Sequence, residues 1–272
     1  AASDVYKRQD VHCNPVFVAY LLISSKDVTL FVNQAKLTAE VSDYLKSEGI
    51  QVEDYEQVEN GLKQYFEYNI LLDPDEVNYR LYEIVKNKGR QNDLPKTEIV
   101  EGESPVKRMK TIKNEREILG FRSAMLKDGI AMTKFLCWLS GYIGKSEISE
   151  LTEIAIDQKL TSLRAEQPLY RDISFDTIAG YGAHAAIVHY EATPETDIPL
   201  QPKGMLLLDS GAQYLDGTTD ITRTIALGSL TEEEKKIFTL VLKGHIQIEL
   251  CKFPSGASGT QIDILARKDM WR

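Results

Sequence analysis

The chain has 272 residues, of which 41 are acidic and 32 basic, so its formal net charge is −9. Hydrophobic residues make up 43% and charged residues 27% of the sequence, a mixture typical of a folded globular protein rather than a disordered one. The acidic balance is opposite to that of most nucleic-acid-binding domains, so no nucleic-acid partner is expected. The length predicts one large domain or two medium ones.

The cysteines and the apolar runs indicate the compartment. Cys13, Cys137 and Cys251 lie far apart with no CxxC pair, which excludes a disulfide scaffold and a zinc knuckle and fits a reducing compartment. The longest apolar run, residues 16–23, is far shorter than the about 20 residues that a membrane-spanning helix needs. The sequence therefore predicts a cytoplasmic protein with no membrane partner.

Both ends of the chain are unusual. Residues 4–9 (DVYKRQ) resemble a translated sequencing adapter, so residues 1–9 are excluded from the fold prediction as non-native. Near the other end, residues 260–263 predict a helix start, and the sequence ends at Arg272 without a capping signal. We therefore expect the sequence to be a gene fragment.

Residues 10–110 alternate strand-like and helix-like segments, which predicts an α/β domain. A buried strand over residues 16–23 and a second strand over residues 28–32 are expected to form a hairpin. The segments expected next are a helix that ends at Gly49, a strand over 50–55, a helix near 62–66 and a strand over 70–72. The charged stretch 86–113 is the predicted domain boundary.

Residues 111–272 predict helices before and after several strands, an α+β order. A capping box at residues 114–117 begins a helix with an apolar stripe, and a second helix is expected to begin at Ser149. Strands are expected over 173–178, 185–190, 205–208 and 218–225, before a capping box at 231–234 that begins an amphipathic helix.

The strongest chemical signal is a pair of aspartates around a predicted hairpin. An apolar strand ends in Asp209, the turn dipeptide Asp216-Gly217 follows, and Asp220 lies on the next strand. The numbers 209 and 220 have an odd sum, as do 216 and 217, so a two-residue turn puts both aspartates on one face. A turn centred on Asp216-Gly217 leaves them offset along that face, whereas a bulge or a turn nearer Tyr214-Leu215 brings them opposite.

Two carboxylates on a buried face repel each other and stay ionised only when a cation lies between them. Carboxylate oxygens suit Mn, Mg or Co, and also Zn. The alternative is that Asp209 and Asp220 are exposed turn residues, because Asp is common in turns.

His189 lies in the apolar segment 185–190, which predicts a strand. It could transfer a proton, hydrogen-bond a tetrahedral intermediate or bind metal. The alternative is a core histidine bonded to a backbone carbonyl. His184, in the glycine-rich loop before it, could lie near a site, but its role stays open.

Residues 209–224 (DSGAQYLDGTTDITRT) resemble the metal-binding hairpin of aminopeptidase P, the Xaa-Pro aminopeptidases of the pita-bread metallopeptidase family. Residues 10–17 (DVHCNPVF), 242–246 (LKGHI) and 253–256 (FPSG) are similar to the long, three-domain form of that family. The resemblance covers residues 10–272. It implies a partial creatinase-like α/β middle domain over 10–110, followed by the N-terminal half of a pita-bread α+β catalytic domain over 111–272.

The resemblance implies a metal-dependent aminopeptidase that releases the N-terminal residue from peptides with proline in the second position. It implies two divalent metal ions, most often Mn, with Zn or Co as alternatives. The position of Asp209 binds one ion, that of Asp220 bridges both, and that of His189 lines the substrate pocket and assists the reaction. His184 and Ala185 replace the Asn and Gly of the usual N-G-A-x-x-H-Y sequence. Family members commonly form homodimers.

The family's other metal ligands, one His and two Glu, would follow residue 272, so the chain alone is expected to be inactive. Prolidase-type dipeptidases share the fold and are harder to exclude, whereas creatinase-like amidinohydrolases lack the metal aspartates. A non-catalytic pita-bread scaffold usually loses metal ligands. An α/β binding module without a site would leave Asp209, Asp220 and His189 unexplained.

Overall fold

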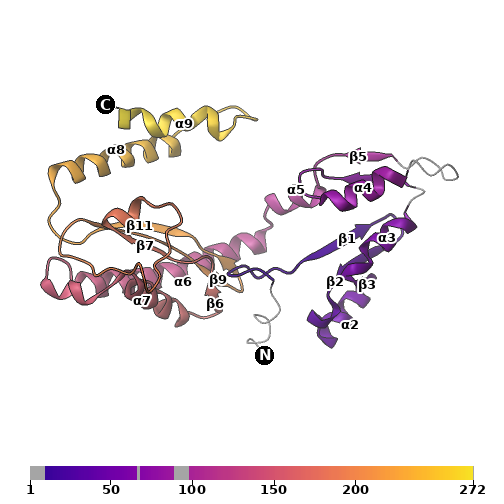
Figure 1. The fold of residues 1–272 in the computed structure, drawn as a ribbon, viewed down its shortest axis with the longest axis horizontal. Helices are drawn as coiled ribbons and strands as arrows, with labels where there is room; N and C mark the ends of the chain where they lie inside the picture. The colour runs from indigo at the N-terminus through magenta and orange to yellow at the C-terminus, as the bar shows by residue number, and fades with distance from the viewer. Residues whose placement is uncertain (1–9, 66–67, 89–97, 272) are drawn as a thin grey trace. The chain divides into compact units, whose positions relative to one another are not determined.

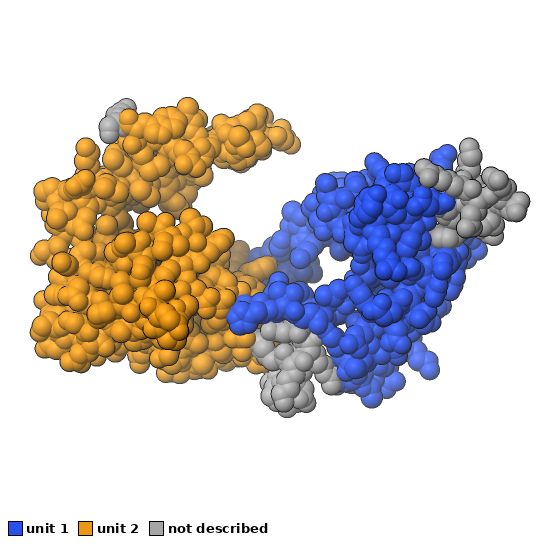
Figure 2. All heavy atoms as spheres, viewed as in Figure 1, with its two compact units in different colours: residues 1–118 blue, residues 119–272 orange. Residues whose placement is uncertain are grey.

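The computed structural model describes residues 10–65, 68–88 and 98–271, drawn as a ribbon in Figure 1. The chain divides into two compact units, residues 1–118 and 119–272, which have separate colours in Figure 2. This division falls just after the charged stretch that ends at Lys113. The adapter-like residues 1–9 lie outside the described residues.

The described residues of the first unit form two small sheets and their helices. Strands β1 (Ala19–Ile23), β2 (Val28–Val32) and β3 (Ile50–Asp54) form one sheet in that order, antiparallel between β1 and β2 and parallel between β2 and β3. Strands β4 (Ile70–Leu72) and β5 (Ile99–Glu101) form a parallel pair. The helices are η1 (Gln34–Lys36), α2 (Ala39–Ser47), η2 (Tyr55–Gln57), α3 (Val58–Gln64), α4 (Tyr79–Lys88) and α5 (Pro105–Thr111).

The predicted hairpin of the first unit is confirmed, and so is the helix that ends before Gly49, whose φ of 74° is the left-handed conformation that glycine adopts easily. The prediction of a buried strand over 16–23 is wrong. Strand β1 begins only at Ala19 and lies at the edge of its sheet, with Leu21 48% and Ile23 64% exposed. Only its alternate side chains, Tyr20 and Leu22, pack on the core around Phe31.

The second unit contains two antiparallel three-stranded sheets, ordered β11-β8-β7 and β10-β9-β6. Their strands are β6 (Tyr170–Ile173), β7 (Ile178–Tyr181), β8 (Met205–Ser210), β9 (Ala212–Tyr214), β10 (Gly217–Thr218) and β11 (Ile221–Ala226). The helices are α6 (Glu115–Ser140), η3 (Ser146–Glu150), α7 (Glu153–Ala165), η4 (Gly182–Ala186), α8 (Glu232–Glu249), α9 (Gly259–Arg267) and η5 (Lys268–Trp271). Among the described residues, no helix is both long enough and apolar enough to cross a membrane.

Helix caps set where these helices begin. Asn114 and Glu117 exchange side-chain and backbone hydrogen bonds of 2.8 and 2.9 Å before α6, and Thr231 caps α8 with the predicted capping box. The predicted start of the second helix at Ser149 is wrong. Ser149 lies in η3, and α7 begins at Glu153 because Thr152 accepts a hydrogen bond from the Ala155 amide.

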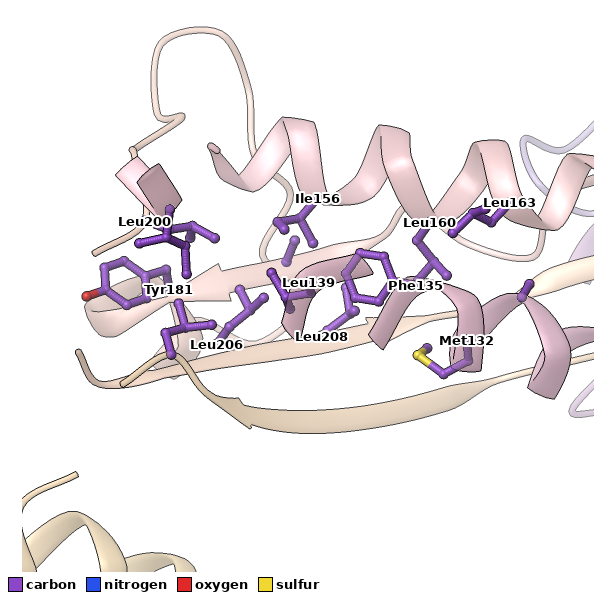
Figure 3. Packing of buried hydrophobic residues seen from close by; sticks show 14 residues of the cluster. Met132, Phe135, Leu139, Ile156, Leu160, Leu163, Tyr181, Leu200, Leu206 and Leu208 are labelled. Carbon is purple, nitrogen blue, oxygen red and sulfur yellow. The ribbon is translucent and has the colours of Figure 1, made fainter. Parts of the chain in front are cut away.

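The core of the second unit lies between helices α6 and α7 and one face of the β11-β8-β7 sheet (Figure 3). The side chains that meet there include Met132, Phe135 and Leu139 of α6, Ile156 and Leu160 of α7, and Tyr181, Leu206 and Leu208 of the strands. In β8, Leu206, Leu208 and Ser210 are buried, so Asp209 points to the opposite face of the sheet. That face is the one that α6 and α7 do not cover.

Two further predictions differ from the structure. The strand expected over 173–178 is split between β6 and β7, because Ser174 bonds to the facing hairpin instead of continuing a ladder. The strand expected over 185–190 is absent, and η4 and a turn occupy that segment. The amphipathic helix predicted after residues 231–234 is confirmed as α8, which packs on α9 (Figure 1). Its side chains Ile237, Phe238 and Val241 are 51%, 43% and 52% exposed.

Candidate functional site

The aspartates lie on one long hairpin that runs through both sheets of the second unit. Asp209 pairs with Thr222, and Tyr214 pairs with Gly217, so the two-residue turn is Leu215-Asp216. This turn is one position earlier than the predicted Asp216-Gly217. Because Thr222 comes two residues after Asp220, the two aspartates share one face and are diagonal neighbours across the strands. That both aspartates share one face is as predicted. Their offset along the strands is intermediate between the one expected for a turn at Asp216-Gly217 and the opposed positions expected for a turn at Tyr214-Leu215.

The two carboxylates influence each other directly. Burial, followed by the charge and a hydrogen bond of Asp209, raises the pKa of Asp220 above its usual value. Asp209 is half-buried and accepts a hydrogen bond of 2.8 Å from Thr222 Oγ1. An acid whose charged form is disfavoured in this way is stabilised by a cation placed between the oxygens. The carboxylate pair therefore fits a divalent metal ion, which prefers such oxygen ligands.

A glycine allows the hairpin to bend beside the carboxylates. Gly211 separates β8 from β9 and lies opposite Asp220 in the register. A Cβ atom there would overlap the carbonyl oxygen of Thr219 and Oγ of Ser174. Ser174 donates from Oγ to the Thr219 carbonyl at 2.8 Å and from its amide to the Gly211 carbonyl at 3.2 Å. This close approach fixes the backbone on both sides of the bend, including the residue before Asp220.

A buried ion pair lies under the same bend. Arg164 of α7 and Asp128 of α6 are both 0% exposed, and two hydrogen bonds of 2.8 and 3.0 Å join them. Arg164 Nη1 also donates to the Gly211 carbonyl at 3.4 Å, and Tyr214 donates its hydroxyl proton to Asp128 at 3.3 Å. Burial and the Asp128 charge raise the pKa of Tyr214, which keeps it a proton donor. The pair thus ties both helices to the hairpin.

The structure places His189 in a turn rather than on the predicted strand. Strand β7 ends at Tyr181, Gly182 has a left-handed φ of 57°, and η4 follows. His189 is exposed and itself has a left-handed φ of 56°, which is uncommon outside glycine. The alternative of a buried core histidine is therefore wrong. No described contact joins His189 to either aspartate, so its role stays a prediction.

Some residues of the site carried no assigned role in the sequence. Thr222 and Gly211 lie inside the motif that was recognised, but only the register shows that one faces Asp209 and the other faces Asp220. Arg164 and Asp128 gave no signal, because an isolated charge on a predicted helix is usually solvated. Glu153, the buried first residue of α7, likewise had no catalytic or binding role assigned from the sequence.

Two family models match the chain. The Creatinase/Prolidase N-terminal domain matches residues 8–117, and Metallopeptidase family M24 matches residues 120–272. The chain belongs to metallopeptidase family M24. This agrees with the predicted fold class, a creatinase-like domain followed by pita-bread catalytic sequence.

Two proteins similar to this M24 chain are named as aminopeptidases. It is 35% identical over 285 residues to Aminopeptidase P2 of Arabidopsis thaliana, covering 97% of this chain and 40% of that protein. It matches the X-prolyl aminopeptidase structure of Caenorhabditis elegans, a cytosolic enzyme with a di-nuclear active site, with a TM-score of 0.82 and 32% identity over 96% of this chain and 42% of that one. The chain thus spans about 40% of the length of such relatives.

A second structure shares the fold alone. The Xaa-Pro dipeptidase of Bacillus anthracis gives a TM-score of 0.67 and 22% identity, over 94% of this chain and 67% of that one. Both kinds of enzyme are therefore built on the architecture described above, so the fold by itself does not select between their substrates.

Proposed function

We propose that this M24 chain is part of a metal-dependent aminopeptidase that releases the N-terminal residue from peptides with proline in the second position. The observation that carries the proposal is the Asp209–Asp220 pair, two interacting carboxylates on one face of the hairpin, with the pKa of Asp220 raised by burial and by Asp209. The names of the relatives support the same activity. Because the chain spans about 40% of those relatives, the activity is proposed for the whole protein.

In this proposal Asp209 and Asp220 hold two divalent ions, with Mn²⁺ favoured because carboxylate oxygens suit it, and Zn²⁺ or Co²⁺ as alternatives. When bound, two such ions polarise the carbonyl of the scissile peptide bond. Thr222 orients Asp209 through its hydrogen bond. His189 is proposed to contact the substrate, which its exposed position permits. The proposed binding partner is a peptide substrate. We also propose that the whole protein forms a homodimer and is located in the cytoplasm.

A peptidase assay with Mn²⁺ tests this function on two samples, the 272-residue chain and the gene product extended beyond residue 272. We expect the extended protein to hydrolyse a tripeptide with proline in the second position, and the 272-residue chain to be inactive. Asp209→Asn and Asp220→Asn should abolish the activity, whereas Asp157→Asn, a carboxylate on α7 that bonds Thr161, should leave it unchanged. An extended protein that is inactive with Mn²⁺, Zn²⁺ and Co²⁺ would refute the proposal.

The dipeptidase is the second candidate, because the Bacillus anthracis structure shares this fold. The two activities differ in the length of the peptide they accept, so the same assay with an Xaa-Pro dipeptide separates them. Cleavage of the dipeptide in preference to the tripeptide would favour the prolidase-type alternative. No cleavage of either, together with no metal binding, would favour a non-catalytic scaffold.

A further inference from the structure

Glu153 is a fully buried carboxylate that the proposed reaction does not use. It is the first residue of α7 and 0% exposed, and the positive end of the helix dipole favours its charge there. A carboxylate buried without partners would be unfavourable, so its hydrogen bonds decide what it stabilises. All the side-chain hydrogen bonds described for its two oxygens come from a single loop.

That loop, residues 181–190, is joined to Glu153 at its beginning, middle and end. The backbone amide of Tyr181 donates to Oε1 at 2.7 Å, His184 Nδ1 lies 2.9 Å from Oε2, and the hydroxyl of Tyr190 donates to Oε2 at 2.8 Å. The rings of His184 and Tyr190 also lie against each other, with centroids 4.5 Å apart. The carboxylate of Glu153 thus holds the beginning, middle and end of the loop close together.

The loop runs over the face of the sheet that carries Asp209. Ile178 of β7 pairs with Asp209, so Ile178 and Gly180, two residues later, point to that face. A Cβ atom on Gly180 would come within 2.8 Å of Ala185 Cα, so the loop backbone rests directly on the strand there. Glycine at position 180 permits this approach.

His189 lies inside the closed part of this loop, directly before Tyr190. Its left-handed backbone conformation is unfavourable for a residue with a side chain and persists only where the surroundings impose it. The Tyr190 amide donates to the Ile187 carbonyl at 3.2 Å across this turn, and the Tyr190 side chain is bonded to Glu153.

We propose that Glu153 is a positioning residue that holds the 181–190 loop on the sheet face that carries Asp209. It thereby fixes the position of His189. His184, in the place of the family's usual Asn, is the middle tie of this arrangement. This inference rests on the proposed function only where it concerns the effect of His189 on peptide cleavage. The loop closure itself is independent of that function.

Hydrogen exchange measured by mass spectrometry on the 272-residue chain tests the closure. Glu153→Gln keeps the side-chain volume and removes the charge, and Tyr190→Phe removes one tie. Glu150→Gln is the matched control, because Glu150 is exposed in η3 three residues away. We expect exchange in peptides from 181–190 to rise about tenfold or more for Glu153→Gln, and less for Tyr190→Phe, as expected for lost hydrogen bonds to a charged group.

Peptides from α6 report on the rest of the unit, and their exchange should stay unchanged in these variants. Exchange of 181–190 at the wild-type rate in both Glu153→Gln and Tyr190→Phe would overturn the closure. Equal acceleration of α6 and the loop in both variants would also overturn it, because Glu153 would then be a general stability residue.

The peptidase assay on the extended protein tests the consequence. Glu153→Gln should lower kcat/KM while Mn²⁺ affinity stays unchanged, and adding His189→Ala to Glu153→Gln should cost less than it costs in the wild type, because both changes disturb the same group. Fully additive losses would overturn the link to His189. If the wild-type extended protein is inactive while the loop still loosens in Glu153→Gln, the proposed function fails and the loop closure stands.

Discussion

Arg164→Met is expected to destabilise the second unit strongly, because it leaves Asp128 buried at 0% exposure without its cation. Breaking a buried ion pair by removing one partner costs about 3–5 kcal/mol. For a unit of this size, that corresponds to a decrease in Tm of about 6–20 °C. Intrinsic fluorescence measures it selectively, since both tryptophans, Trp138 and Trp271, lie in the second unit.

An exposed ion pair between the same two helical segments provides the control. Lys134 of α6 lies 2.9 Å from Glu166 at the end of α7, and both side chains are about half exposed. Lys134→Ala should cost about 0–1 kcal/mol, because solvent screens the pair. The double variant Asp128→Leu/Arg164→Met should be more stable than Arg164→Met alone, since no unpaired charge is buried. Arg164→Met with the Tm of Lys134→Ala would refute the reasoning.

Three further predictions follow from the hairpin and from α8. Gly211→Ala should lower the Tm, because its Cβ would overlap the facing strand, and a wild-type Tm would show that the bend needs no glycine. Burial alone would raise the pKa of Asp216, but hydrogen bonds and charge from Lys127 lower it overall below 3.8. The Lys127–Asp216 pair therefore stabilises the fold at pH values at which Asp216 is ionised, and this stabilisation is lost as Asp216 becomes protonated at lower pH. The Tm difference between wild type and Lys127→Met should shrink as the pH falls below 3.8, and a Tm difference that stays constant would contradict this. Phe238→Glu with Val241→Glu should reduce self-association in light scattering, because both side chains are exposed apolar groups, and unchanged association would count against this surface.

The shared face of Asp209 and Asp220 could be predicted because strand side chains alternate with a period of two, whichever odd-sum pair forms the turn. The position of the turn could not, because long-range contacts influence it. Lys127, 89 residues away in sequence, binds Asp216 at 2.6 and 2.7 Å, and Gly120 packs against the carbonyl of Asp216. A turn dipeptide in the sequence carries no information about such contacts.

The strand predicted around His189 is absent from the structure for a related reason. A short apolar run is compatible with a strand, and periodicity alone cannot separate a strand from a turn. What decides its structure is Glu153, whose partners Tyr181, His184 and Tyr190 lie 28 to 37 residues further along the chain. The helix starts, by contrast, were largely predictable, since caps such as Thr231 act within three residues.

The most direct test of the account is Mn²⁺ binding to the gene product extended beyond residue 272, monitored by electron paramagnetic resonance of the free ion. We expect the wild type to bind Mn²⁺, and Asp209→Asn and Asp220→Asn each to lose that binding while Asp157→Asn retains it. The far-UV circular dichroism of all four proteins should be the same. Mn²⁺ binding that is unchanged in both hairpin variants, or absent from a folded wild type, would contradict the claim that these carboxylates form a metal site.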